Sequence, residues 1–432
     1  MNRLSGAEAM VRLLQAHGVT HVFGLCGDTS LPLYDALCRL DHGITHILTR
    51  DERHAAYMAD GYARVTGRPG VCEGPSGGGA TYILPGVVEA NESSIPLLAI
   101  TTDIATTSRG RFVLTELDQE ALFAPLTKWN GVIPRAALLP GMVRRAFREL
   151  TTGRPGAVHL GLPFDVQKDA VEEEEIRADG FARPRAGPDP AAIERLAEAL
   201  WSAERPVVVC GGGVHRSAAS AELAALAERH DLAVATTISG KGVLADSHPL
   251  MLGVVGSNGG TPETRAVLDQ ADLVLFLGCR AGSVTTERWR HPRPGAARIA
   301  HIDIDPRVPG ATYPTEIAIV ADAREALTAL LAASRMAHGE RAWDVRARIA
   351  DAKGRKRARF EALAASSARP ILPERLVADL QAVLPEVATV VADPGTPCPY
   401  LAAYLQLGPQ QGFMSNRAHG ALGWSLAAAM GA

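Results

Sequence analysis

Residues 49–64 decide the fold that we expect, and they read Thr-Arg-Asp-Glu-Arg-His-Ala-Ala-Tyr-Met-Ala-Asp-Gly-Tyr-Ala-Arg. A short β-like run, residues 44–48, precedes them, and their own pattern is alanine-rich and helical. Glu52 therefore stands where a strand gives way to a helix, at the carboxyl edge of a parallel sheet. Open α/β sheets bind their ligands at this edge. The alternative is that Asp51 and Glu52 only interact favourably with the helix dipole. The stretch alone leaves both interpretations open.

Strands and helices alternate along the rest of the chain. The predicted strands contain few charges, as is typical of strands buried in parallel sheets. They cover residues 21–24, 70–73, 96–100, 157–163, 206–210, 233–237, 273–278, 299–305 and 388–393. This alternation predicts an α/β protein built from successive doubly wound parallel-sheet domains.

Composition shifts predict the domain boundaries. The predicted parts are an α/β domain over residues 1–170, a linker over 171–190, a central α/β domain over 191–335, a helical connector over 336–369 and a partial third domain over 370–432. The linker is acidic and then proline-rich, which suits an exposed segment. The connector carries a basic cluster between Lys353 and Arg359, which we interpret as a solvated face of a helix.

The composition is that of a water-soluble globular protein. Of the 432 residues, 47% are hydrophobic and 21% charged, and the net charge of −3 gives no reason to expect nucleic acid or an anionic membrane as a partner. The six cysteines show no C-x-x-C pair, which is typical of free thiols in a reducing compartment. With no signal pattern at the N-terminus and no apolar run of transmembrane length, we expect a cytoplasmic protein.

Residues 49–64, together with residues 22–28 and 76–81, resemble the N-terminal domain of thiamine-diphosphate-dependent enzymes of the acetolactate synthase and 2-oxo acid decarboxylase superfamily. The resemblance implies that residues 1–170 bind the aminopyrimidine of thiamine diphosphate and that residues 370–432 begin the diphosphate-binding domain. It also implies that Glu52 is catalytic. In that family the glutamate at this position hydrogen-bonds N1′ of the cofactor and so activates it.

The same resemblance implies the other site residues. Those expected to bind the cofactor are Gly27, Ser76, Gly395, Thr396, Pro397, Cys398, Gly420, Ala421 and Leu422. Residues 395–398 would offer donors to the diphosphate at a helix N-terminus, and Leu422 would wedge between the two rings. Candidates for the substrate pocket are Cys26, Asp28, Tyr82 and His419. The alternatives are ordinary helix packing for residues 420–423 and a supporting hydrogen-bonded role for His419.

The motif that carries the Mg²⁺ ligands in this family, Gly-Asp-Gly…Asn-Asn, is absent from the sequence. We therefore expect Mg²⁺ to bind outside this chain, on a second polypeptide that completes the third domain and covers the apolar residues 418–432. A truncated or cleaved chain, a natural split and a degenerate homologue all remain open. The resemblance further implies self-association as a dimer or tetramer, with FAD in the central domain left open.

The predicted function is a lyase or carboligase acting on a 2-oxo acid or an acyloin. Cys26 replaces the family's proline, and residues 53–54 replace its Gln-Gly. These departures count against acetolactate synthesis as the activity, but they do not affect the prediction that the protein uses thiamine diphosphate. One rival hypothesis is a non-catalytic regulatory or assembly subunit. The other is a nucleotide-dependent oxidoreductase that uses residues 211–213, although the dinucleotide fingerprint fails at Arg216, where its third glycine would be.

Overall fold

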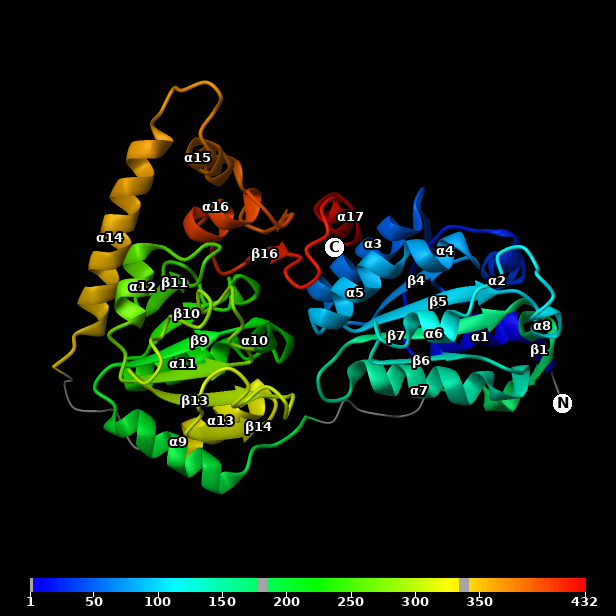
Figure 1. The fold of residues 1–432 in the computed structure, drawn as a ribbon, viewed down its shortest axis with the longest axis horizontal. Helices are drawn as coiled ribbons and strands as arrows, with labels where there is room; N and C mark the ends of the chain where they lie inside the picture. Colours follow the sequence, from blue (N-terminus) through cyan, green and yellow to red (C-terminus); the bar gives the residue numbers. More distant parts are fainter. Residues whose placement is uncertain (1–2, 178–184, 334–341) are drawn as a thin grey trace. The chain divides into compact units, whose positions relative to one another are not determined.

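The computed structural model describes residues 3–177, 185–333 and 342–432, which form two compact units (Figure 1). The first unit comprises Met1–Pro184 together with Asn416–Ala432, and the second comprises Arg185–Ser415. Each unit contains a six-stranded parallel sheet. The predicted fold class, doubly wound parallel-sheet α/β domains, is confirmed.

The sheet of the first unit has the strand order β3-β2-β4-β5-β7-β6. Its strands are β2 (His21–Gly24), β3 (Thr45–Leu48), β4 (Gly70–Gly74), β5 (Leu97–Asp103), β6 (Trp129–Val132) and β7 (Ala157–Pro163). Every residue of β4, β5 and β7 is buried, because helices cover both faces of the sheet.

The helices of the first unit lie on both faces of this sheet, with α3 and α5 on one face and α1 and α7 on the other (Figure 1). They are α1 (Gly6–Ala16), α2 (Leu31–Arg39), α3 (Glu52–Thr66), α4 (Gly78–Tyr82), α5 (Leu84–Glu92), α6 (Gln119–Phe123), α7 (Leu139–Thr151), α8 (Phe164–Lys168) and α17 (Trp424–Gly431). Helix α3 begins at Glu52 because the side chain of Asp51 accepts a hydrogen bond from the amide of Arg53. It ends at Gly67, which adopts the left-handed conformation with φ of 66°.

A short antiparallel pair joins the two ends of the first α/β segment. Strand β8 (Ala170–Glu172) pairs with β1 (Arg3–Ser5), so the predicted linker starts within a strand. Residues 178–184 of that predicted linker lie outside the described residues. The exact five-part domain division stays a prediction.

The second unit repeats the architecture, with the strand order β11-β10-β9-β12-β13-β14. Its parallel strands are β9 (Pro206–Cys210), β10 (Ala233–Thr236), β11 (Met251–Val254), β12 (Leu273–Leu277), β13 (Arg298–Asp303) and β14 (Ile317–Val320). The helices packed around them are α9 (Pro190–Ser202), α10 (Gly212–Arg216), α11 (Ser220–His230), α12 (Pro262–Leu268) and α13 (Ala323–Ala333). One large apolar core fills the space between these layers.

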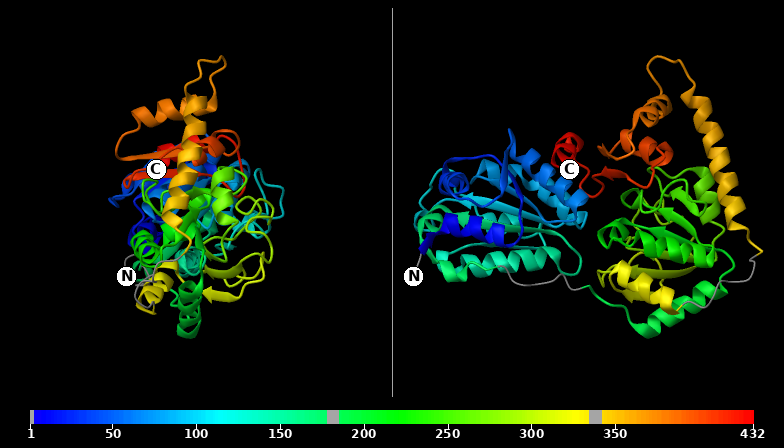
Figure 2. Two further views of the ribbon diagram at one scale, coloured as in Figure 1. Left: turned by 90° about the vertical axis from the view of Figure 1, so that its left-hand side faces the viewer. Right: turned by 180° about the vertical axis from the view of Figure 1, so that it is seen from behind.

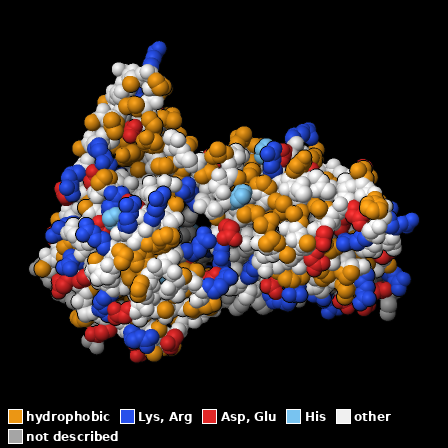
Figure 3. All heavy atoms as spheres, viewed as in Figure 1, with side chains coloured by type: hydrophobic (Ala, Val, Ile, Leu, Met, Phe, Trp, Pro, Cys, Tyr) orange, Lys and Arg blue, Asp and Glu red, His pale blue; other side chains and the backbone are white. Residues whose placement is uncertain are grey.

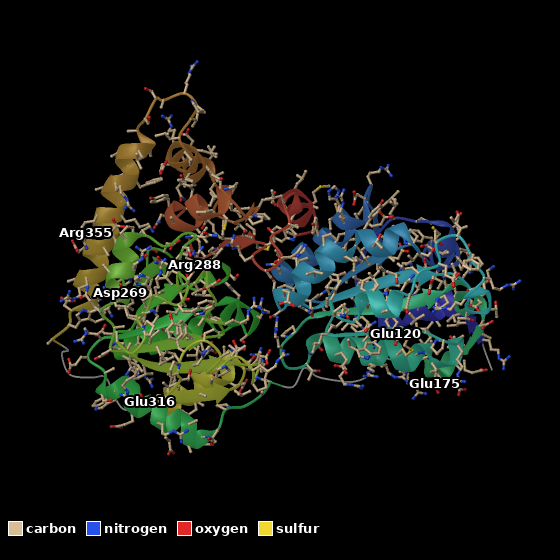
Figure 4. All side chains as sticks on the ribbon, in the orientation of Figure 1. Glu120, Glu175, Asp269, Arg288, Glu316 and Arg355 are labelled. Atoms are coloured by element: carbon tan, nitrogen blue, oxygen red, sulfur yellow. The ribbon has the colours of Figure 1, made fainter. Side chains whose placement is uncertain are left out.

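The predicted connector contains the long helix α14 (Val345–Ala364), which Figure 1 shows beside the second sheet. Its basic cluster is only partly solvated. Arg355, labelled in Figure 4, forms an exposed ion pair with Asp351. Lys353 instead donates to the backbone carbonyls of Asp246 and His248. The expected solvated face is therefore wrong for Lys353, because this side of α14 packs on the unit.

A smaller parallel sheet follows α14. Among the described residues, this sheet and the β1–β8 pair are the two sheets that contain only two strands. The sheet after α14 consists of β15 (Ala388–Ala392) and β16 (Gln411–Ser415), with α15 (Pro373–Val383) and α16 (Pro397–Tyr404) beside them. Exposed apolar side chains gather on this part of the chain (Figure 3), among them Ile371, Leu376 and Val383. None of the helices in the described residues is both long and apolar enough to cross a membrane.

Helix α17 packs along α3, and Figure 2 shows the two from further directions. The backbones approach closely, because a Cβ at Gly61 would lie 2.2 Å from the carbonyl oxygen of Ala428. Trp424 is fully buried in this contact, whereas Leu426 and Met430 are 74% and 68% exposed. Within this chain, α3 therefore covers one side of the apolar segment that we expected a second polypeptide to cover.

Candidate active site

Glu52 is the first residue of α3 and lies at the carboxyl edge of the first sheet. The amide of Thr49, just before it, donates to the carbonyl of Gly24 at the end of β2 over 2.9 Å. The Glu52 side chain is 8% exposed, and it has no hydrogen-bond partner among the residues that the structure describes. A buried carboxylate without a partner is costly. Glu52 is therefore available to a ligand that donates a hydrogen bond.

A glycine loop between β4 and α4 lies against Glu52. A Cβ at Gly79 would lie 3.2 Å from Oε1 of Glu52 and 2.4 Å from Cδ of Pro75. Gly77 has a φ of 68°, which side-chain-bearing residues rarely adopt. The absence of side chains at Gly77 and Gly79 thus lets the loop backbone lie close to the carboxylate.

Gly27 and Ser76, both predicted to bind the cofactor, belong to the same cluster of loops. A Cβ at Gly27 would lie 2.5 Å from Cβ of Pro75, so only glycine permits this contact. The hydroxyl of Thr29 is 3.1 Å from Oγ of Ser76, and Oγ of Ser76 is 2.7 Å from Oγ1 of Thr115. These contacts join the loop after β2 to the loop after β4.

A second carboxyl, Glu73 of β4, lies close to Glu52 and was missed by the sequence analysis. It is 1% exposed and accepts hydrogen bonds from the hydroxyls of Ser30, over 2.5 Å, and Tyr34, over 2.8 Å. Burial raises the pKa of Glu73 to about 7, and the nearby charge of Glu52 adds to this effect. In the sequence, Glu73 is the only charged residue of an otherwise uncharged strand, β4, and this feature could have marked it as a candidate site residue.

The segment that contains His419 and Leu422 is fastened to the first unit by a buried glutamate. Glu89 is fully buried, and its carboxylate accepts hydrogen bonds from the backbone amides of Arg417, Ala418 and His419 at 3.1, 3.2 and 2.7 Å. Sequence reasoning could not find this contact, because Glu89 and His419 are 330 positions apart.

An ion-pair network extends from Glu89 to α17. Arg64 of α3 bonds Glu89 at 3.1 Å and Asp60 at 3.0 Å. Nε1 of Trp424 donates to Asp60 over 2.8 Å. Burial raises the pKa of Asp60 to about 6, and the charge of Arg64 acts in the opposite direction. Residues 417–424 are thus held on α3 and α5, the same helices that flank the Glu52 loop.

The remaining residues predicted in this unit are open to solvent. Cys26 and Asp28 are exposed, Tyr82 is 56% exposed and Leu422 is 74% exposed. Gly420 has a φ of 75°, and the carbonyl of Ala421 accepts a hydrogen bond from the side chain of Asn416 over 2.7 Å. The structure therefore leaves the side chains of these pocket candidates accessible.

The predicted diphosphate turn belongs to the second unit. Gly395 has a φ of 96°, and Thr396 precedes α16 without any side-chain cap on the helix. Pro397 has no N–H to offer, and the Cys398 side chain is fully buried in an apolar cluster. The donors to an anion here would be backbone amides and the exposed hydroxyl of Thr396.

Two further predictions concern a metal site and a nucleotide-binding site at residues 211–213. The described residues contain no group of three or more His, Cys, Asp or Glu side chains that could hold a metal ion. At the glycine run, a Cβ on Gly211 would lie 2.2 Å from the carbonyl oxygen of Gly278, and one on Gly213 would lie 2.7 Å from Cα of Gly278. Close packing of the turn against the end of β12 therefore explains these glycines.

Residues 4–122 match the family described as the thiamine pyrophosphate enzyme N-terminal TPP binding domain. Residues 193–330 match the thiamine pyrophosphate enzyme central domain. Both matches agree with the domain types that the sequence analysis expected from the resemblance.

Curated relatives are similar to nearly the whole chain. A probable acetolactate synthase large subunit of Methanocaldococcus jannaschii is 36% identical over 99% of this chain and 73% of its own length. The acetolactate synthase large subunit of Corynebacterium glutamicum is 33% identical over 100% of this chain and 68% of its own length. A probable 2-ketoarginine decarboxylase of Pseudomonas aeruginosa is 34% identical over 99% of this chain and 74% of its own length.

Proposed function

The chain belongs to the thiamine pyrophosphate enzyme family, of the acetolactate synthase and 2-oxo acid decarboxylase type, and from this premise we propose that it is a lyase or carboligase acting on a 2-oxo acid or an acyloin. The observation that carries the proposal is the buried Glu52 carboxylate, which has no partner among the described residues and lies against the glycine loop at Gly79.

These residues fit the aminopyrimidine of thiamine diphosphate. A planar ring could approach this loop closely at Gly77, Gly78 and Gly79, which carry no side chains, and a ring nitrogen that carries a proton would satisfy the Glu52 carboxylate. When bound, thiamine diphosphate supplies the electron sink for breaking or forming a bond next to a carbonyl carbon.

In this proposal the chain's own residues have three tasks. Glu52 holds the ring and accepts or returns a proton at its carboxylate, and its burial strengthens that hydrogen bond. Ser76 and Thr29 hold the two glycine loops together. Glu89 fixes the backbone of residues 417–419 and so positions His419, Gly420, Ala421 and Leu422.

The substrate part of the proposal is a small or medium-sized 2-oxo acid. Its support is that the names of the relatives include both an acetolactate synthase and a 2-ketoarginine decarboxylase. Cys26, Asp28, Tyr82 and His419 are the candidates for contact with the substrate. For Cys26, Asp28 and Tyr82 the support is their exposed side chains beside the Glu52 loops.

The proposal also includes a second polypeptide that carries the Mg²⁺ ligands, and self-association as a dimer or tetramer. The exposed apolar side chains of Leu422, Leu426 and Met430 support a protein contact on this side of α17. Residues 395–398 would then hold the diphosphate through backbone amides and the Thr396 hydroxyl, and the Mg²⁺ ligands would come from the partner. FAD in the central domain and the cytoplasmic location stay predictions.

The test compares the wild-type protein with Glu52→Gln, with and without the partner polypeptide. A panel of 2-oxo acids is assayed with thiamine diphosphate and Mg²⁺ for CO₂ release and for condensation products. We expect Glu52→Gln to lower turnover by about 10²–10⁴-fold, the usual contribution of a positioned acid–base group, with an unchanged melting temperature. Wild-type turnover by Glu52→Gln at saturating cofactor would contradict the assignment.

The same assay separates the rival hypotheses. A regulatory or assembly subunit would show no turnover that depends on Glu52, and would instead raise the activity of its partner. An oxidoreductase would turn over only with a nicotinamide or flavin nucleotide. Acyloin cleavage without any turnover of 2-oxo acids would reject the decarboxylase part of the proposal.

A further inference from the structure

Glu73 is a buried carboxyl that interacts with Glu52 and has two hydroxyl donors, Ser30 and Tyr34. It lies on β4, opposite Gly24 of β2 in the parallel register. A Cβ at Gly24 would lie 2.7 Å from Oη of Tyr34 and 2.9 Å from Oε2 of Glu73. Only glycine at this position therefore permits the hydrogen bond between Tyr34 and Glu73.

A chain of hydrogen bonds runs outward from Glu73. Oη of Tyr34 is 2.8 Å from Oε2 of Glu73 and 3.0 Å from Nε2 of His46. His46 is half-buried on β3, an edge strand of the sheet, and therefore reaches solvent. A phenol can accept a proton from one neighbour while it donates its own to the other. The hydrogen bonds from Glu73 through Tyr34 to His46 thus form a continuous path from the buried carboxyl to the edge of the sheet.

The charges around Glu73 favour its neutral form. The titratable groups that face it are Glu52 from α3, Tyr34 from α2, Cys26 from the loop after β2 and its neighbour Cys72. None of these is a cation, and no arginine or lysine among the described residues is hydrogen-bonded to Glu73. Two close carboxylates in a buried site do not both ionise readily.

Tyr34 and His46, the other members of this hydrogen-bonded path, have protonation states that suit proton transfer from Glu73. Burial lowers the pKa of His46, so its ring is neutral near pH 7 and can accept a proton. Burial and the charge of Glu73 raise the pKa of Tyr34, so the phenol transmits a proton without ionising. A proton donor, a carrier and an acceptor therefore stand in sequence.

We propose that Glu73 holds a proton beside Glu52 and exchanges it with solvent through Tyr34 and His46. This inference rests on the proposed function for its purpose, which is to keep the charge of the two-carboxyl site constant when Glu52 gains or loses a proton. Glu73 is a positioning residue in this scheme, since it acts through Glu52.

One proton moves and no electrons are transferred. The phenol of Tyr34 first turns its O–H from Oε2 of Glu73 towards Nε2 of His46. The O–H bond of Glu73 then breaks as Tyr34 Oη takes the proton, while the proton of Tyr34 passes to Nε2 of His46. The products are the Glu73 carboxylate, the restored phenol and a protonated His46 ring, which then releases its proton to water. The reverse sequence reloads Glu73.

The first experiment uses the purified chain without cofactor. Infrared difference spectra should show a carboxylic-acid carbonyl band that disappears with a midpoint near pH 7 and is missing in Glu73→Gln. Asp60→Asn identifies the band of the other buried carboxyl whose pKa is raised. Spectra in which Glu73→Gln removes no protonated-carboxyl band would overturn the proposal.

The second experiment tests the connection to His46. With ¹³C-labelled histidine rings, and His46→Gln for assignment, the His46 resonance should show a second inflection near pH 7. We expect this inflection to vanish in Glu73→Gln and in Tyr34→Phe. Ser30→Ala is the matched control, because it removes the other hydroxyl donor to Glu73 and leaves the route to His46 intact. Equal titration curves for wild-type and Tyr34→Phe proteins would overturn the relay.

Neither measurement needs turnover, so the two proposals can fail separately. If both spectroscopic results hold and no 2-oxo acid is consumed, the proposed function fails and the relay stands. If turnover depends on Glu52 while its pH profile is the same in Tyr34→Phe and Ser30→Ala, the function stands and the relay is rejected.

Discussion

The two six-stranded parallel sheets of this protein differ in whether the buried charged side chains at their carboxyl ends are paired with opposite charges. In the first unit Glu52 is buried without a partner among the described residues, close to a second buried carboxyl, Glu73. In the second unit the buried Lys241 pairs with Asp246 at 3.1 Å, and Asp246 also accepts the amide of Leu407 over 2.8 Å. One edge therefore retains unsatisfied charge for a ligand, whereas the other neutralises its charge internally.

This difference teaches that the architecture alone does not locate the chemistry. Both sheets have glycine turns where a strand meets a helix, at Gly77–Gly79 in the first unit and Gly211–Gly213 in the second. The first turn lies against the unpartnered carboxylate of Glu52, whereas the second packs against the backbone of Gly278. What surrounds each glycine decides whether the turn can serve a site.

Removing the buried side-chain charge of Lys241 in the second unit should have the largest effect on stability. Lys241→Met breaks the buried ion pair with Asp246 and leaves Lys353 and Lys356 as the cations that act on this carboxylate. We expect a loss of up to about 3–5 kcal/mol in the free energy of unfolding of this unit. Denaturant titration measures it. In the first unit Glu52→Gln should cost no stability, since Glu52 has no partner among the described residues. Equal losses for the two variants would remove the distinction between the edges.

The pH dependence of stability should differ between the units because of Glu73. Its pKa is raised from 4.5 to about 7 on folding, so the folded state binds the proton more tightly than the unfolded state. The stabilisation is complete below about pH 4.5 and is lost as pH rises through 7, by roughly 3 kcal/mol in total.

Denaturant titrations of the wild-type protein and Glu73→Gln between pH 4.5 and 8 measure this loss. The stabilisation by Glu73, taken as the difference between the wild-type protein and Glu73→Gln, should fall across that range. The buried His159 and His46, whose pKa values burial lowers, change the stability of both proteins in the opposite direction and cancel in this difference. A slope that survives the substitution would assign it to another group, with Asp60 the next candidate.

A methyl group added to the glycine turn beside Glu52 should have a smaller effect on stability. Gly79→Ala places a Cβ 2.4 Å from Pro75 and 3.2 Å from Glu52, so we expect an overpacking cost of about 1–3 kcal/mol and weaker binding of thiamine diphosphate. Gly78→Ala is the matched control, because its nearest neighbour would be Tyr82 at 3.8 Å. Calorimetry of cofactor binding compares the two. Equal affinities would show that this turn does not border the cofactor.

The strands were predicted well wherever a short apolar run lies between turn residues. Strands β2, β7 and β9 have the predicted bounds, and the helix after Thr49 begins where the sequence places it. Local hydrogen bonding explains this success, because Asp51 caps α3 within its own first turn. Glu73 was missed because a strand pattern shows that a residue is buried and does not show which hydroxyls surround it.

The sequence by itself determined the fold class, the family and the place of Glu52, since these depend on local periodicity, capping and motifs only a few residues long. Only the tertiary structure decided that Glu73 shares a hydrogen-bond chain with Tyr34 and His46, and that Glu89 fastens residues 417–419. The physical reason is distance along the chain. Hydrogen bonds between residues tens or hundreds of positions apart form when whole layers pack, and no local pattern encodes which side chains then meet.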